Sequence, residues 1–211
     1  MESQLILGTG TGVGKTWASA WLCRRGLGQG RRTAYLKPVQ TGCGDLPGDA
    51  EWVRARCGAS LLPGCLELAS PYRFPLAASP HLAAREAGVE APGIAEVASA
   101  IAALVEVAAP ELLIVESAGG VASPLRLGCT MGDLAAALRL PVVLVASPGL
   151  GTLSATATAL EYLKNRGVIP AGLIVSGCSP QPDLVEADNL RLLEEMAAPG
   201  FFEKLMREDC P

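Results

Sequence analysis

Short, almost entirely apolar segments recur along this chain, separated by longer segments in which apolar residues return every three or four positions. Several of the short segments contain no charged residue, which is typical of strands buried on both faces of a parallel sheet. The predicted strands are residues 5–7, 33–36, 112–115, 142–146 and 173–175.

The longer segments predict helices between these strands. Residues 152–166, for example, place Leu153, Ala157 and Leu160 on one face and end before Gly167. This alternation predicts an α/β fold, with a mostly parallel sheet flanked by helices and ligands bound at the carboxyl ends of the strands. We see no internal repeat or linker and expect one domain over residues 1–211. The predicted helices are residues 16–25, 49–57, 94–108 and 152–166.

The segment GTGTGVGKT at residues 8–16 joins the first predicted strand to the first predicted helix. Its glycines let successive backbone N–H groups point at one anion, and the helix N-terminus adds partial positive charge. Lys15 would reach the terminal phosphates of a nucleotide, and the Thr16 hydroxyl would hold Mg²⁺. The usual pattern has glycine six residues before the lysine, where this chain has Thr9 between two glycines. Strand, loop and helix together still predict a phosphate-binding site of the P-loop NTPase kind.

Composition narrows the class of protein further. The formal net charge of −4 over 211 residues argues against a nucleic-acid surface. The uncharged stretch 140–160 has the length of a membrane span, but its prolines and glycines predict a strand, a turn and a helix start instead. The cysteines contain no C-x-x-C pair, so we expect reduced thiols in a cytoplasmic protein without a signal peptide. They are Cys23, Cys43, Cys57, Cys65, Cys129, Cys178 and Cys210.

Lys37 follows the second predicted strand, and Pro38 disfavours a helix at that point. In a parallel sheet Lys37 would lie at the same edge as residues 8–16, where its ammonium could neutralise charge on a transferring phosphoryl group. An ordinary solvated lysine is the alternative interpretation. Thr41, just downstream, could hydrogen-bond a substrate or could simply close a turn.

Two carboxylates are candidate ligands for Mg²⁺. Glu116 ends the apolar run 112–115 and precedes a loop of small residues, 117–120, as in P-loop proteins whose strand-terminal carboxylate serves the metal. A buried strand that happens to end in Glu is the alternative. Asp49 follows the loop 44–48 and could bind Mg²⁺, directly or through water, or cap the helix that begins there.

Two further features concern helix starts. Ser79 followed by Pro80 predicts an N-cap and a first helical residue. The single histidine, His81, has no nucleophile at a fixed spacing, which favours a structural role over that of a general base. Residues 147–152, SPGLGT, open a helix whose free N–H groups could receive a carboxylate, or they serve only to end the preceding strand.

Taken in order, these motifs resemble those of the dethiobiotin synthetase family, from residue 8 to about residue 180. The matching segments are GTxTxVGKT at 8–16, KPV and TG within 37–42, DA at 49–50, PYxF at 71–74, SPH at 79–81, VExAGG at 115–120 and GLGT at 149–152. The resemblance implies ATP-dependent closure of a ureido ring. In the family, 7,8-diaminopelargonate takes up CO₂ as a carbamate, the carbamate oxygen attacks the γ-phosphate of ATP, and the second amine displaces phosphate to give dethiobiotin. Family enzymes are homodimers with the substrate at the subunit interface.

The resemblance also implies roles for individual residues. Lys15 and Lys37 would be catalytic, stabilising phosphoryl and carbamate charge. Mg²⁺ would be held by Thr16, Asp49 and Glu116. The ATP-binding residues would be Gly12, Val13, Gly14, Lys15, Thr16, Trp17, Asp49, Glu116, Ser117, Ala118, Gly119 and Ser176. The substrate-binding residues would be Lys37, Thr41, Gly119, Leu150, Gly151 and Thr152, the last three acting across the dimer interface.

The chain departs from the family pattern at three places. Ser117 stands where the family usually has glycine, and its Cβ either fits the loop or crowds it. Ser176 stands where an asparagine that reads adenine is common, and residues 196–211 lack a Pro-x-Leu-Gly-x-x-Pro pattern. We therefore expect a looser preference for the nucleotide base than the family norm.

Two other P-loop classes are competing interpretations. A partitioning-type ATPase switch usually carries a second lysine early in the phosphate loop and an amphipathic membrane helix, whereas this chain has TGT at 9–11 and an unconvincing acidic segment at 189–197. A synthase of the type that acts on cobyrinate would need a glutaminase domain, and none fits after residue 180. Both interpretations are weaker than the ligase.

Overall fold

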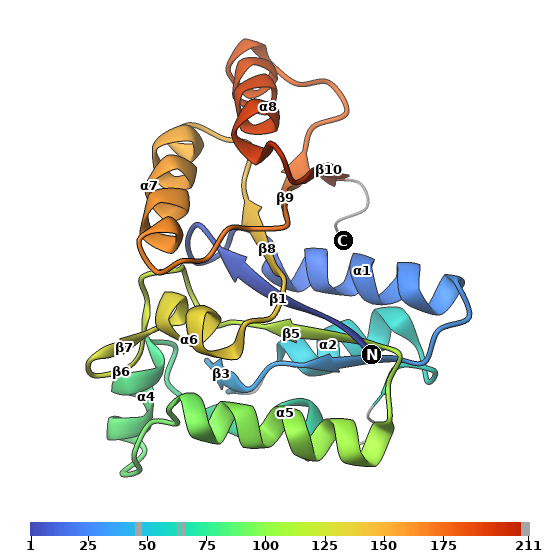
Figure 1. Cartoon of the computed structure of the whole chain (residues 1–211), viewed down its shortest axis with the longest axis vertical. Helices are drawn as coiled ribbons and strands as arrows, with labels where there is room; N and C mark the ends of the chain where they lie inside the picture. The colour runs from blue at the N-terminus through green and yellow to red at the C-terminus, as the bar shows by residue number, and fades with distance from the viewer. Residues whose placement is uncertain (45–47, 63, 65, 208–211) are drawn as a thin grey trace.

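A parallel sheet lies between two layers of helices, and its first strand is central (Figure 1). The computed structural model describes residues 1–44, 48–62, 64 and 66–207. The strand order is β10-β9-β8-β1-β5-β2, and every pairing between these neighbours is parallel. The strands are β1 (Glu2–Gly8), β2 (Thr33–Leu36), β5 (Leu112–Glu116), β8 (Val142–Ala146), β9 (Gly172–Cys178) and β10 (Phe201–Met206).

The predicted strands are confirmed, and the apolar runs are the cause. β5 and β8 are buried along their whole length, as expected for strands covered by helices on both faces. β10 was missed, because it is a partly exposed edge strand that carries Glu203 and Lys204. Such charged, mixed sequence is typical of sheet edges and gives no apolar run to detect.

The helices divide between the two faces of the sheet. α1 (Lys15–Gly28) and α2 (Asp49–Cys57) pack on one face. On the other face lie α4 (Pro80–Glu86), α5 (Ile94–Ala108), α6 (Met131–Leu138), α7 (Thr152–Lys164) and α8 (Leu184–Ala197). The four predicted helices are confirmed as α1, α2, α5 and α7, whereas α6, α8 and the short α3 (Leu66–Ala69) were not predicted.

Two small strand pairs accompany the main sheet. β3 (Val39–Thr41) pairs in parallel with β4 (Tyr72–Phe74), and β6 (Pro124–Arg126) pairs antiparallel with β7 (Cys129–Thr130). β3 begins two residues after Lys37 and carries Thr41 at its end. The pair therefore fixes the segment that leaves the sheet beside the phosphate loop.

Within the described residues, no helix has both the length and the apolarity to cross a membrane. The uncharged stretch 140–160 is divided between β8, a turn and α7, as predicted. Cys23, Cys43, Cys57 and Cys129 are free thiols, Cys178 is buried, and Cys65 and Cys210 lie outside the described residues.

Candidate active site

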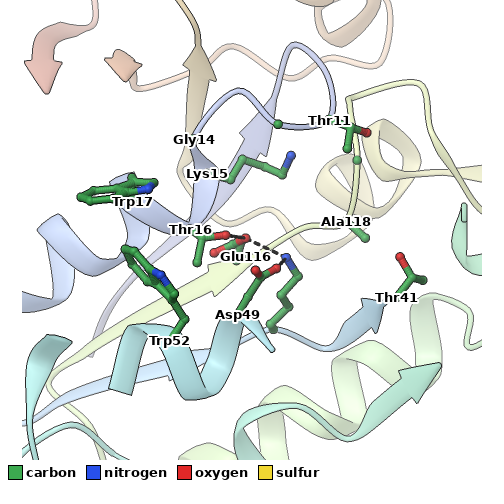
Figure 2. A pocket seen from close by; sticks show the side chains of 13 residues that line it. Thr11, Gly14, Lys15, Thr16, Trp17, Thr41, Asp49, Trp52, Glu116 and Ala118 are labelled. Carbon is green, nitrogen blue, oxygen red and sulfur yellow. Dashed lines mark hydrogen bonds and ion pairs between the residues drawn. The ribbon is translucent and has the colours of Figure 1, made fainter. Parts of the chain in front are cut away.

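A cavity of about 410 Å³ opens at the carboxyl edge of the sheet, between the loop after β1, the starts of α1 and α2, and the loop after β5 (Figure 2). It brings together four segments that are distant in the sequence and that the motifs singled out. The lining residues are Thr11, Gly12, Gly14, Lys15, Thr16, Trp17, Lys37, Thr41, Asp49, Trp52, Glu116, Ala118 and Gly119.

The phosphate loop is shaped by backbone that only glycine adopts freely. Gly14 is the N-cap of α1 with φ 92°, and a Cβ there would also collide with the side chain of Ser176 on β9. The free N–H groups at the start of α1 border the cavity, which suits an anion. Thr9, the departure from the usual glycine, donates its backbone N–H to Val145 at 2.9 Å and is accommodated as an extension of the sheet.

Lys15 lies almost buried at the start of α1 and donates to the carbonyl of Gly10 at 3.0 Å. Burial is the largest influence and lowers the pKa of Lys15 to about 8; the carboxylate of Glu116 opposes this fall and the ammonium of Lys37 adds to it. The side chain is a cation that can follow the charge of a phosphate chain, as P-loop lysines do.

Glu116 is the centre of the hydrogen-bond network. Its side chain is fully buried at the end of β5. Oε1 accepts from the Thr16 hydroxyl at 2.9 Å and from the Lys37 ammonium at 2.8 Å, and Oε2 accepts from the Tyr35 hydroxyl at 2.8 Å. A buried carboxylate needs such partners, because an unpaired charge in the interior is very costly.

The Lys37 ammonium also pairs with the carboxylate of Asp49. Burial by itself would lower the pKa of Lys37, but the charges of Glu116 and Asp49 outweigh it and raise that pKa. Lys37 is therefore a permanent cation in the cavity wall, and the interpretation as a solvated surface lysine is wrong. The buried hydroxyl of Tyr35 has its pKa raised by burial first and by Glu116 second, so it stays a donor.

Asp49 is the first residue of α2, and the N-cap is Gly48 in extended conformation without a side-chain cap. The alternative in which Asp49 caps the helix is therefore wrong. Its carboxylate faces Lys37 instead, which places it beside Glu116. Residues 45–47 of the loop before it lie outside the described residues.

The oxygens of Thr16, Asp49 and Glu116 fit Mg²⁺, a hard cation that favours carboxylate and hydroxyl oxygen and retains water or phosphate ligands. Thr16 bonds to Glu116 directly, and Lys37 links Glu116 to Asp49. No cluster of three or more His, Cys, Asp or Glu side chains that could hold a metal is present among residues 1–44, 48–62, 64 and 66–207. This donor set suits a cation that shares its coordination with nucleotide phosphates.

The loop after β5 approaches the phosphate loop through its glycines. Gly119 has φ 72°, and a Cβ there would clash with Ser123; at Gly120 a Cβ would be 3.1 Å from Cα of Gly10. Ser117 is buried without a positive φ, so serine fits at this position. The close approaches that require glycine are at 119 and 120, not at 117.

Several predicted site residues do not line the cavity. Ser176 is buried against Gly14, and Leu150 is 94% exposed at the turn before α7. The buried amide of Asn189 on α8 holds that turn, donating to the carbonyls of Pro148 at 3.0 Å and Gly149 at 3.2 Å. The predicted residues outside the lining of this cavity are Val13, Ser117, Leu150, Gly151, Thr152 and Ser176.

Sequence reasoning missed three residues of the site: Thr11 and Trp52, which line the cavity, and Tyr35, which donates to Glu116. Tyr35 precedes Lys37 by two positions, the spacing that places side chains on one face of a strand. Trp52 follows Asp49 by three positions, the spacing of neighbours on a helix surface.

As predicted, Ser79 is the N-cap of α4 and Pro80 its first residue, while the Ser79 hydroxyl contacts the His81 ring at 3.0 Å. His81 does not line the cavity.

Comparison with known proteins places this geometry in context. The family described as an AAA domain matches residues 3–199. The ATP-dependent dethiobiotin synthetase BioD of Mycolicibacterium vanbaalenii is 40% identical over 199 residues, covering 93% of this chain and 84% of that protein. The protein of the same name from Parafrankia sp. is 41% identical over 201 residues, covering 94% and 81%. The solved structure of apo McdA from Cyanothece superposes with a TM-score of 0.58 at 14% identity, covering 98% of this chain and 86% of that one, which is a likeness of fold alone.

Proposed function

The chain belongs to the ATP-dependent dethiobiotin synthetase family, and on that premise we propose that it closes the ureido ring of dethiobiotin from 7,8-diaminopelargonate and CO₂ with Mg²⁺ and ATP. Membership makes it an ATP-dependent cyclo-ligase that forms carbon–nitrogen bonds. Besides these substrates and this metal, we propose that the protein is a homodimer in the cytoplasm. We also propose that residues 1–211 form one synthetase domain.

One observation carries the proposal: Lys15 and Lys37 line a single cavity, and Lys37 bonds to the same oxygen of Glu116 as Thr16 does. Ring closure creates negative charge twice, first on the carbamate and then on the transferring phosphoryl group. Fixed cations stabilise such charge without reorganising during the reaction. Because the pKa of Lys37 is raised, its ammonium stays charged at neutral pH and can act on both anions.

The proposed reaction has three steps. One amine of the substrate adds to CO₂ and loses a proton to give a carbamate. A carbamate oxygen then attacks the γ-phosphorus, the bond to the β-phosphate oxygen breaks, and ADP leaves. The second amine attacks the carbamoyl carbon of this mixed anhydride, the bond from that carbon to the phosphate oxygen breaks, the amine proton leaves with phosphate or water, and the ring closes. Lys37 and Thr41 line the cavity and would contact the carbamate, whereas Lys15, at the end of the phosphate loop, would contact the phosphates.

Thr16, Asp49 and Glu116 would hold Mg²⁺, which supplies charge neutralisation and orientation of the β- and γ-phosphates when bound. The nucleotide would lie along residues 12–17, with Ala118 and Gly119 facing it across the cavity. We propose that the turn Leu150-Gly151-Thr152, of which Leu150 and Gly151 are exposed, serves the partner subunit's substrate carboxylate in a homodimer, since Gly151 caps α7 and leaves free N–H groups there.

The test is phosphate release from ATP and Mg²⁺, with and without 7,8-diaminopelargonate and bicarbonate, followed by mass spectrometry of the product. Diamine-dependent release with a product of dethiobiotin mass is the expected result. Release that ignores the diamine would indicate a switch-type ATPase and overturn the proposal. The same assay with CTP and GTP separates a failure of the nucleotide from a failure of the ring chemistry.

A further inference from the structure

Two tryptophan side chains meet at one end of the cavity. Trp17 directly follows Thr16 on α1, and Trp52 lies one helical turn after Asp49 on α2. Their ring centroids are 4.8 Å apart and their planes are inclined by 65°. Both rings are partly exposed and both line the cavity. Figure 2 shows them together on one side of Thr16 and Asp49, with Thr11 and Thr41 on the other side.

Packing into the core accounts for only one of the two rings. Trp52 packs against the hydrophobic core beneath α1 and α2. In the described part of the chain, Trp17 packs against neither of the two hydrophobic core clusters. Its ring contacts are Trp52 and the guanidinium of Arg56 instead. A large apolar ring that faces a polar cavity without serving the core is a feature that binding explains better than folding does.

Arg56 holds the pair in place. Its guanidinium carbon lies 3.4 Å from the ring centroid of Trp52 and 5.7 Å from that of Trp17. A guanidinium over an indole face is an attractive arrangement that fixes the orientation of the ring. The two indoles and Arg56 therefore form a stiff aromatic wall, here called the tryptophan wall.

We propose that the tryptophan wall receives the base of the nucleotide by stacking, an inference that rests on the proposed use of ATP by this site. In the proposed reaction the phosphate loop holds the phosphates, and the terminal phosphate meets the second substrate beside Lys37 and Thr41, which line the cavity. The nucleoside must then leave the loop at the opposite end, where Trp17 and Trp52 lie. Ser176, the position expected to read the base, is packed against Gly14 and does not line this cavity.

Stacking has a consequence for specificity. Every base offers a π-face to an aromatic ring, so stacking binds without selecting between bases, whereas hydrogen bonds to base edges select. A site whose main contact with the base is the tryptophan wall will accept ATP, CTP and GTP with affinities within about 10-fold of one another.

The test measures dissociation constants for the Mg²⁺ complexes of ATP, CTP, GTP and inorganic tripolyphosphate, without the diamine, so that it does not depend on ring closure. Trp17→Leu and Trp52→Leu should each raise the dissociation constants for all three nucleotides by about 10-fold, the order expected for one lost stacking contact. Neither substitution should change the dissociation constant for tripolyphosphate. Trp17→Phe should keep most of the affinity. The matched control is Trp21→Leu, because Trp21 lies one turn along α1, under Arg25, and does not line this cavity.

An equal loss of tripolyphosphate affinity would overturn the proposal, since the rings would then act by shaping the phosphate loop. Unchanged nucleotide affinity in the Trp17→Leu and Trp52→Leu variants would also overturn the proposal. If those variants instead showed a raised KM for the diamine, the tryptophan wall would bind the carbon chain of that substrate. A protein that binds nucleotides through the wall but makes no dethiobiotin would refute only the proposed function.

Discussion

The ammonium of Lys37 lies 2.8 Å from Oε1 of Glu116, the same oxygen that accepts a hydrogen bond from Thr16. Lys37 pairs with Asp49 as well. Two of the three oxygen donors proposed for Mg²⁺ thus pair with one lysine, and the third, Thr16, bonds to the same oxygen of Glu116. This lysine has two roles in the proposal: it compensates the buried charge of Glu116 and it supplies charge to the reaction.

Lys37→Met should therefore lose activity and stability together. We expect turnover to fall at least about 100-fold, because a cation beside the reacting groups is lost. We expect the free energy of unfolding to fall by about 3 kcal/mol, because Glu116 keeps a buried charge without its ion-pair partner. Product formation and chemical denaturation measure the two effects. Lys164→Met is the control, since Lys164 is an exposed lysine 3.7 Å from Glu161. Near-normal turnover of Lys37→Met would show that Lys37 takes no part in the mechanism.

Tyr35→Phe tests whether the second oxygen of Glu116 needs its donor. The Tyr35 hydroxyl is fully buried and bonds to Oε2 at 2.8 Å, so its removal leaves a buried charged acceptor with one partner fewer. The expected loss is about 1–3 kcal/mol of stability, with a raised apparent KM for Mg²⁺ and a smaller change in kcat. Tyr72→Phe, at a partly buried tyrosine outside the cavity lining, should change neither quantity. An unaltered requirement for Mg²⁺ in Tyr35→Phe would show that the tyrosine is only structural.

The sequence predicted those features whose cause is local or topological. The phosphate loop depends on nine consecutive residues, and the strand before it carries the continuous apolar run 5–7. The meeting of Thr16 with Glu116, 100 residues apart, was also predictable, because parallel strands bring their carboxyl ends to one edge.

The remaining features depend on contacts that leave no pattern in a single sequence. A tyrosine inside an apolar strand looks the same whether its hydroxyl meets a carboxylate or water. Asp49 could bind Mg²⁺ or cap a helix, and the fold makes Gly48 the N-cap while the Asp49 carboxylate pairs with Lys37. β10 pairs through its backbone at the sheet edge, so its side chains do not reveal it.

The lowered pKa of Lys15 predicts how nucleotide affinity depends on pH. A lysine with pKa about 8 is charged at pH 7 and largely neutral at pH 9. Phosphates bind the charged form, so the dissociation constant for ATP should rise by about 10-fold between pH 7 and pH 9. Calorimetry in buffers of different ionisation enthalpy should show proton uptake on binding at pH 8.5. Lys15→Arg, whose guanidinium does not titrate in this range, should show neither effect; a flat profile for the unaltered protein would contradict the prediction.

Ser117 tests which positions of the loop after β5 require glycine. The Ser117 hydroxyl is buried without a hydrogen-bond partner in the described chain, so Ser117→Ala should keep activity and gain up to about 1 kcal/mol of stability. Ser117→Gly should also keep activity but lose about 0.5–1 kcal/mol relative to Ser117→Ala, because glycine has more conformational freedom to lose on folding. Gly119→Ala is the contrasting variant: at φ 72°, with Ser123 in the path of a Cβ, it should displace the loop from the cavity and impair turnover. Turnover and thermal unfolding of the three variants give the comparison. Inactivation by Ser117→Ala would mean that the hydroxyl contacts a reacting group, because that substitution leaves the backbone unchanged.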